Sequence, residues 1–190
     1  MKKIMIAAAI ATMAIASQAY DIKWGARNMY IPVADNVAIS QTGIVPTSGD
    51  KFGDSGKAAL TVSLFWVSTD GDVKIGDFTT TGAGAISAQT LGSGTESDLY
   101  KAMVADQGAN WKPQYHFTAT YSTADGVYTY DGTATAANQI GNLSQAANSL
   151  TADFKTSGSW DYKANAVPEP TSGLLLLLGV AGLALRRRRA

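Results

Sequence analysis

The chain has 190 residues, of which 46% are hydrophobic and 16% charged, and it contains no cysteine. This length suffices for one hydrophobic core and does not require two domains. Disulfides are excluded, and the single histidine leaves a zinc site almost without ligands.

The formal net charge of zero hides an uneven distribution. Lys2, Lys3 and four arginines lie near the two ends of the chain. When these six residues and Glu169 are set aside, residues 21–167 carry nine basic and fourteen acidic side chains, a net charge of −5. A mildly acidic segment of this kind disfavours nucleic acids and other anionic partners.

The amino terminus has the three-part pattern of a secretory signal peptide. Two lysines near the start form a positive region, residues 4–15 are apolar, and Ser17 and Ala19 are small. We therefore predict a signal peptide over residues 1–19, cut by signal peptidase between Ala19 and Tyr20. An uncleaved signal anchor is the alternative, and both lead the chain to the same compartment.

An exported domain is predicted over residues 20–166. Its first part, 21–40, contains scattered apolar residues interrupted near Pro32, which indicates one or two short strands. Residues 41–56 are rich in Gly, Ser, Thr and Asp and are predicted to form a loop.

Two β-hairpins are predicted from period-two alternation. In residues 57–67 the alternating apolar side chains indicate a strand central in its sheet, and residues 73–78 return after a turn. Aromatic residues alternate over 111–123, and the strand at 127–130 follows Asp125 and Gly126, a strong turn signal.

The remaining segments are less regular. Residues 79–94 are predicted to be structurally quiet, and a helix is expected from Thr95 or Ser97 to Ala105. Residues 134–150 have a possible helical face of Ile140, Leu143, Ala147 and Leu150, weakened by Gly141 and polar residues. The last strand is expected within 154–162.

This pattern of short strands and turns predicts the fold class. We expect a mainly β protein, with a single β-sandwich or jelly-roll-like exported domain and one or two short helices.

The sequence offers little for catalysis. Residues 53–56, Gly-Asp-Ser-Gly, resemble the nucleophile motif of trypsin-like serine proteases, but the flanking Lys57 and the position of His116 after the serine do not fit that family. A tight turn is the better interpretation. His116 alternates with Tyr115 and Phe117 and is predicted to lie on the surface face of its strand.

Metal binding and sugar chemistry also lack a clear pattern. Asp70, Asp72 and Asp77 do not follow the order of an EF-hand loop, so a solvated hairpin turn is expected and no metal or cofactor is predicted. No pair of carboxylates stands out for glycoside hydrolysis. The four tryptophans are expected mostly in the core, with a sugar-stacking face as the alternative.

The carboxyl-terminal tail, residues 167–190, has the clearest pattern. Pro168, Glu169 and Pro170 precede an uncharged, leucine-rich run over 173–185. As a helix this run would be roughly 20 Å long, against a hydrocarbon core of about 30 Å. We predict a short transmembrane helix, which the bilayer can accommodate by thinning. Its topology is set by the cationic cluster of Arg186, Arg187, Arg188 and Arg189, because moving each across the membrane costs about 3 kcal/mol.

Taken together, the Pro-Glu-Pro residues, the leucine-rich helix and the arginines resemble the PEP-CTERM sorting signal of Gram-negative bacteria. This resemblance is confined to the tail. It implies recognition by exosortase, a membrane-embedded cysteine transpeptidase-like enzyme, with cleavage near Pro-Glu-Pro, in a host that makes extracellular polysaccharide. A plain C-terminal membrane anchor is the alternative.

These observations predict an exported surface or extracellular-matrix protein. The resemblance implies sorting by exosortase and association with extracellular polysaccharide. Because no catalytic pattern stands out in the exported domain, we expect it to have no enzymatic activity. A carbohydrate-binding module is the first alternative and a secreted hydrolase the second.

Overall fold

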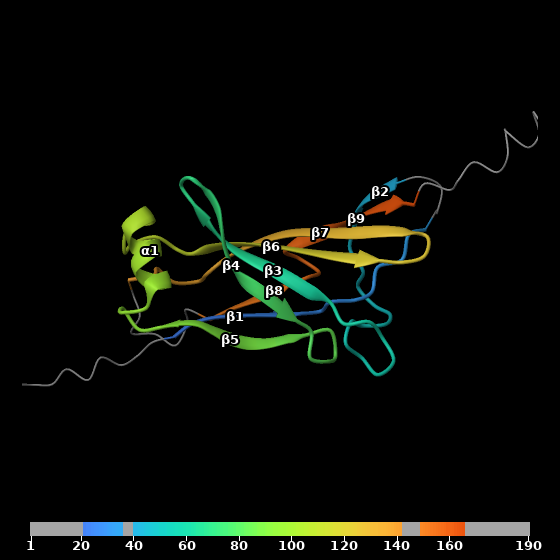
Figure 1. Cartoon of the computed structure of the whole chain (residues 1–190), viewed down its shortest axis with the longest axis horizontal. Coiled ribbons are helices and arrows are strands. Elements are labelled where there is room, and N and C mark those ends of the chain that lie inside the picture. Colours follow the sequence, from blue (N-terminus) through green and yellow to red (C-terminus); the bar gives the residue numbers. More distant parts are fainter. Residues whose placement is uncertain (1–20, 36–39, 142–148, 166–190) are drawn as a thin grey trace, which may run out of the picture.

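The computed structural model describes residues 21–35, 40–141 and 149–165. Within these ranges the chain forms two β-sheets that pack against each other, with one helix at one end (Figure 1). The larger sheet has the strand order β2 (Ser40–Ile44), β9 (Gly158–Ala164), β7 (Gly126–Thr135), β6 (Gln114–Ser122), β3 (Thr61–Ser68) and β4 (Gly71–Thr79). The smaller sheet has the order β5 (Ile86–Ser93), β1 (Asp21–Arg27) and β8 (Ser149–Asp153). The predicted mainly β class is confirmed, and the two packed sheets are consistent with the predicted β-sandwich.

Aromatic side chains fill the space between the sheets. Trp24 of β1 is fully buried, and its ring centroid lies 5.5 Å from that of Phe78 in β4 and 6.0 Å from that of Phe117 in β6. Tyr130 of β7 stacks on Phe154 at 4.1 Å. Burial of each large apolar side chain stabilises the fold by roughly 1.5–3 kcal/mol, so the core can hold the sheets together without disulfides.

A pair of glycines makes this aromatic cluster possible. Gly132 and Gly158 are directly opposite one another in β7 and β9. A Cβ atom on Gly158 would lie 2.0 Å from the carbonyl oxygen of Asp131, and one on Gly132 would lie 2.6 Å from the ring of Tyr130. The two strands and the ring therefore approach more closely than any larger residue would permit.

Both predicted hairpins are confirmed. The first is formed by β3 and β4, with Ser68 opposite Gly71, and the second by β6 and β7, with Ser122 opposite Val127. Strand β3 lies between β4 and β6, so its predicted central position is also confirmed.

The predicted helix is α1 (Asp98–Gln107). The Ser97 side chain accepts a hydrogen bond from the backbone N–H of Tyr100 at 3.4 Å, which satisfies one of the free donors at the helix start. Met103 is the fully buried residue on its inner face, and the helix ends at Gly108, where φ is 82°. The cap at Ser97 is confirmed, and the helix continues to Gln107, two residues beyond the expected Ala105.

Two predicted irregular segments contain strands. Residues 41–56 were expected to be a loop, but β2 covers their start, and residues 79–94 were expected to be quiet, but they contain β5. Both are edge strands that pair with a single neighbour, β9 and β1 respectively. Few side chains of these edge strands are buried, so their sequences need not alternate between apolar and polar residues. Backbone pairing with the neighbouring strand keeps them extended.

Two predictions near the end of the domain are also corrected. Leu150 lies in strand β8 rather than on a helical face, because β8 pairs in parallel with β1. The last strand begins at Gly158, and Phe154 lies in the turn that precedes it, where the N–H of Ser157 donates to Asp153 O at 2.9 Å. Leu143 and Ala147 lie outside the described residues.

The predicted signal peptide, 1–19, and the predicted transmembrane helix, 173–185, also lie outside the described residues. Across the ranges that are described, no helix combines the length and the apolar character that a membrane span requires.

Candidate functional site

The outer face of the larger sheet, the side turned away from the core, is polar. Side chains alternate along each strand, so Tyr130 and Trp160 are buried while Asp131 and Asp161 are exposed. Cross-strand pairing aligns the outward residues in rows, of which one runs across five strands: Ser159, Asp131, Thr118, Ser63 and Asp77. Hydroxyl and carboxylate groups thus lie side by side on a rigid support.

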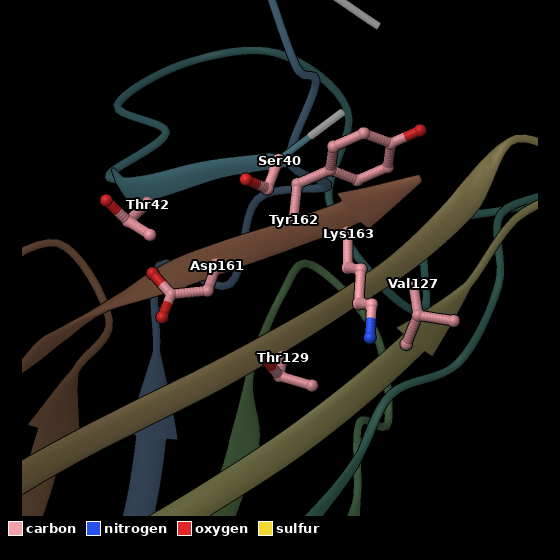
Figure 2. A pocket seen from close by; sticks show the side chains of 7 residues that line it. All are labelled: Ser40, Thr42, Val127, Thr129, Asp161, Tyr162 and Lys163. Atoms are coloured by element: carbon pink, nitrogen blue, oxygen red, sulfur yellow. The ribbon is translucent and has the colours of Figure 1, made fainter. Parts of the chain in front are cut away.

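A groove of about 540 Å³ opens on this face where β2, β9 and β7 run together (Figure 2). The residues that line it come from three strands: Ser40, Thr42, Val127, Thr129, Asp161, Tyr162 and Lys163. Figure 2 shows the side chains of Asp161 and Lys163 on one side of β9 and the ring of Tyr162 leaving the strand on the other side. That ring is buried and packs on Tyr128, so it offers no stacking platform to the groove.

The groove combines hydroxyls with one carboxylate and one ammonium group. Asp161 Oδ1 accepts a hydrogen bond from the backbone N–H of Gly43 at 3.0 Å, which fixes the carboxylate and the β2 backbone relative to each other. Lys163 contributes three donors on a flexible stem. Such a surface can hydrogen-bond a polyol.

His116 lies on the same outer face, and carboxylates engage both of its ring nitrogens. Nδ1 contacts Asp72 of β4, and Nε2 lies 3.2 Å from Asp131 Oδ2 of β7. Phe65 of β3 stacks on the imidazole with ring centroids 5.7 Å apart. Burial lowers the pKa of His116, but hydrogen bonds to the two carboxylates outweigh it, and the net pKa lies above its ordinary value.

This arrangement bears out the predicted outward position of His116. Tyr115 and Phe117 are buried, and His116 takes the opposite face. Because both nitrogens contact carboxylates, the imidazole links β4 to β7.

The residues of the other sequence motifs form no common site in the structure. Residues 53–56 form a turn, in which the N–H of Lys57 donates to Asp54 O at 2.9 Å. Asp77 accepts from Ser63 Oγ at 2.6 Å, whereas Asp72 contacts His116, so these two aspartates do not converge. In the described ranges no three acidic, histidine or cysteine side chains are grouped to hold a metal ion.

The tryptophans are mostly core residues, as expected. Trp24, Trp66 and Trp160 are at most 5% exposed, and the half-buried Trp111 packs edge-on against Trp66 at 6.1 Å. None of the four lines the groove.

The groove was not anticipated from the sequence. The alternation of Val127 with Thr129 and of Asp161 with Lys163 indicates outward positions on two strands. No pattern in the sequence indicates that β2, and with it Ser40 and Thr42, lies beside β9.

The residues predicted for sorting and processing lie outside the described ranges: Ala19, Tyr20, Pro168, Glu169, Pro170, Arg186, Arg187, Arg188 and Arg189. Neither the curated proteins nor the solved structures include a match to this chain. The family model of the PEP-CTERM protein-sorting motif matches residues 166–189. The chain therefore carries a PEP-CTERM sorting tail, which indicates an exported protein that exosortase processes from a membrane-anchored precursor.

Proposed function

We propose that this protein is a surface or extracellular-matrix component that exosortase releases from its membrane-held precursor and that associates with extracellular polysaccharide. The match of residues 166–189 to the sorting motif carries the proposal. From its length in the sequence, the leucine-rich run is short for a stable span, and prolines at 168 and 170 favour an extended chain before it. This is a suitable form for a segment that a transpeptidase must thread through its active site.

We further propose that the exported domain is not an enzyme. Two sets of contacts support this. His116 contacts the carboxylates of Asp72 and Asp131. Asp77 accepts a hydrogen bond from Ser63 and forms an ion pair with Lys74 at 2.9 Å. These contacts give each group a structural role as a link between strands.

The sorting proposal is tested by combining Glu169→Ala with Pro170→Ala in the full chain. The parent should appear as a shorter form that lacks residues 173–190, and the variant should remain full-length and membrane-held. Thr171→Ala, which leaves Pro-Glu-Pro intact, is the matched control and should be processed like the parent. Mass spectrometry of native protein decides the outcome: if peptides with intact Arg186 and Arg189 dominate in mature surface material, the tail is an ordinary anchor.

A carbohydrate-binding role for the groove is the second candidate. The hydroxyls of Ser40, Thr42 and Thr129 and the Lys163 ammonium group suit the hydroxyls of a saccharide, although aromatic stacking is not available. Affinity electrophoresis in the host's own polysaccharide provides the test. Lys163→Ala with Thr129→Ala should abolish retardation, while Lys74→Ala, at the opposite edge of the sheet, should not. Equal retardation of all three proteins would rule the groove out.

A further inference from the structure

The last described residues of the chain are fastened to the turn between β6 and β7. The backbone N–H of Asn165 donates to Asp125 O at 2.8 Å, and its side-chain amide donates to Ala124 O at 2.9 Å. Tyr162 Oη donates to the same Asp125 carbonyl at 3.0 Å. We call this arrangement of Tyr162, Asn165 and turn residues 124–126 the exit corner. It lies at the end of the sandwich where β9 and the β6–β7 turn meet (Figure 1).

The exit corner leaves very little chain before the sorting motif. Asn165 directly precedes the first residue that the motif match covers, and Ala166 and Val167 alone separate it from Pro168. Three Cα steps of at most 3.8 Å place Pro168 within about 11 Å of Asn165. That distance is about the thickness of one sheet layer, so an enzyme bound at Pro168 is in contact with the folded domain.

Residues just before the motif are needed both by the fold and by the enzyme. Proteins that capture an extended peptide hydrogen-bond to its backbone over several consecutive residues. On the domain side of Pro168 those residues include Ala164 and Asn165. Ala164 is paired with Gly126 in the sheet, and Asn165 bonds Asp125 O through its backbone N–H and Ala124 O through its side chain, so the fold already holds this segment.

We propose that the exit corner restrains exosortase cleavage and that Asn165 is the positioning residue that holds it closed. Cleavage requires the corner to open so that residues 164–167 can enter the enzyme. The inference rests on the proposed processing at Pro-Glu-Pro, and it assigns to the exported domain a direct influence on the rate of that processing.

The test compares three full-length variants in a host with active exosortase, by pulse–chase of precursor and product. Asn165→Ala removes the side-chain bond to Ala124 and weakens the backbone bond to Asp125. Together these changes should speed cleavage roughly tenfold. Six Gly and Ser residues inserted between Asn165 and Ala166 keep the corner intact but supply free chain, and they should accelerate cleavage at least as much. Ser159→Ala, on the same strand but outside the corner, should match the parent.

Two further measurements separate positioning from a general loss of structure. Combining Asn165→Ala with the insertion should give no more acceleration than the insertion alone, because both relieve the same restraint. In Asn165→Ala, the exchange rate of the backbone amide at position 165 should rise about tenfold, while the exchange rate at Tyr130 should stay unchanged.

Three outcomes overturn the inference. If the parent is processed and neither Asn165→Ala nor the insertion is faster, the corner imposes no restraint. If the insertion slows cleavage, the corner is instead a docking surface that the enzyme needs close to Pro168. If neither the parent nor any variant is cleaved at Pro-Glu-Pro, the proposed function itself fails and the inference with it.

Discussion

Replacing Gly158 by alanine tests whether the contact between β7 and β9 is as close as the structure indicates. The added Cβ would lie 2.0 Å from Asp131 O and 2.5 Å from Gly132 Cα. Both neighbours are backbone atoms, so no side-chain rotation can relieve the overlap. Overpacking of a tight interior costs about 1–3 kcal/mol, and we expect the upper end of that range. For a domain of this size a loss of about 3 kcal/mol lowers the Tm by about 10 °C.

Gly76 provides a matched control in the same cross-strand row. It lies opposite Leu64, which lies opposite Phe117, which in turn lies opposite Gly132. A Cβ on Gly76 would meet only the Phe78 ring at 3.5 Å, an ordinary contact. Gly76→Ala should therefore change the free energy of unfolding by less than about 1 kcal/mol, in the stabilising direction if at all.

Urea unfolding of the exported domain, followed by circular dichroism, measures both variants. The m value should stay constant, so that a shift in midpoint reports stability alone. A loss below about 1 kcal/mol for Gly158→Ala, or equal losses for both variants, would contradict the close contact between the strands.

Three other predictions concern pH, processing and metal. The folded pKa of His116 lies above its ordinary value of 6.5, so its stabilising contribution is complete below about pH 6.5 and is lost as the pH rises through the folded pKa. His116→Gln should therefore lower the Tm more at about pH 6 than at about pH 9, and an equal loss at both pH values would exclude the charged link. Amino-terminal sequencing of the exported protein should begin at Tyr20, and a start at Met1 in surface material would refute signal-peptide cleavage. Thermal unfolding in chelator should match that in added calcium; a rise of many degrees with calcium would show that a cation site was overlooked.

The sequence predicts those elements whose alternation, turn residues or helix caps match the way the element packs in the fold. Both hairpins combine alternating apolar residues with a turn, and α1 has Ser97 at its start and Gly108 at its end. In β3, β6 and β7 the alternation arises because one face of the strand is buried and the other is not.

The edge strands β2 and β5 could not be predicted, because few of their side chains are buried and their sequences therefore lack apolar alternation. Strand β2, with Gly43 inside it, has no buried residue, and Ile86 is the buried residue of β5. Leu150 suits a helix as well as a strand, and only its place beside Trp24 in the parallel β1–β8 pair decides between them. For the same reason the groove could not be predicted, since it depends on which strands become neighbours.

The order of strands in space has a consequence for when the domain can form. β9 is the last described strand in the sequence, yet it lies between β2 and β7, and its Lys163 pairs with Ser40, 123 positions earlier. Pairings so distant in sequence make folding slow. A chain that emerges progressively from its amino terminus cannot close the larger sheet until residue 158 and beyond have been delivered. Until then β7 presents an unpaired edge, so a chain that ends before Gly158 should be prone to aggregation.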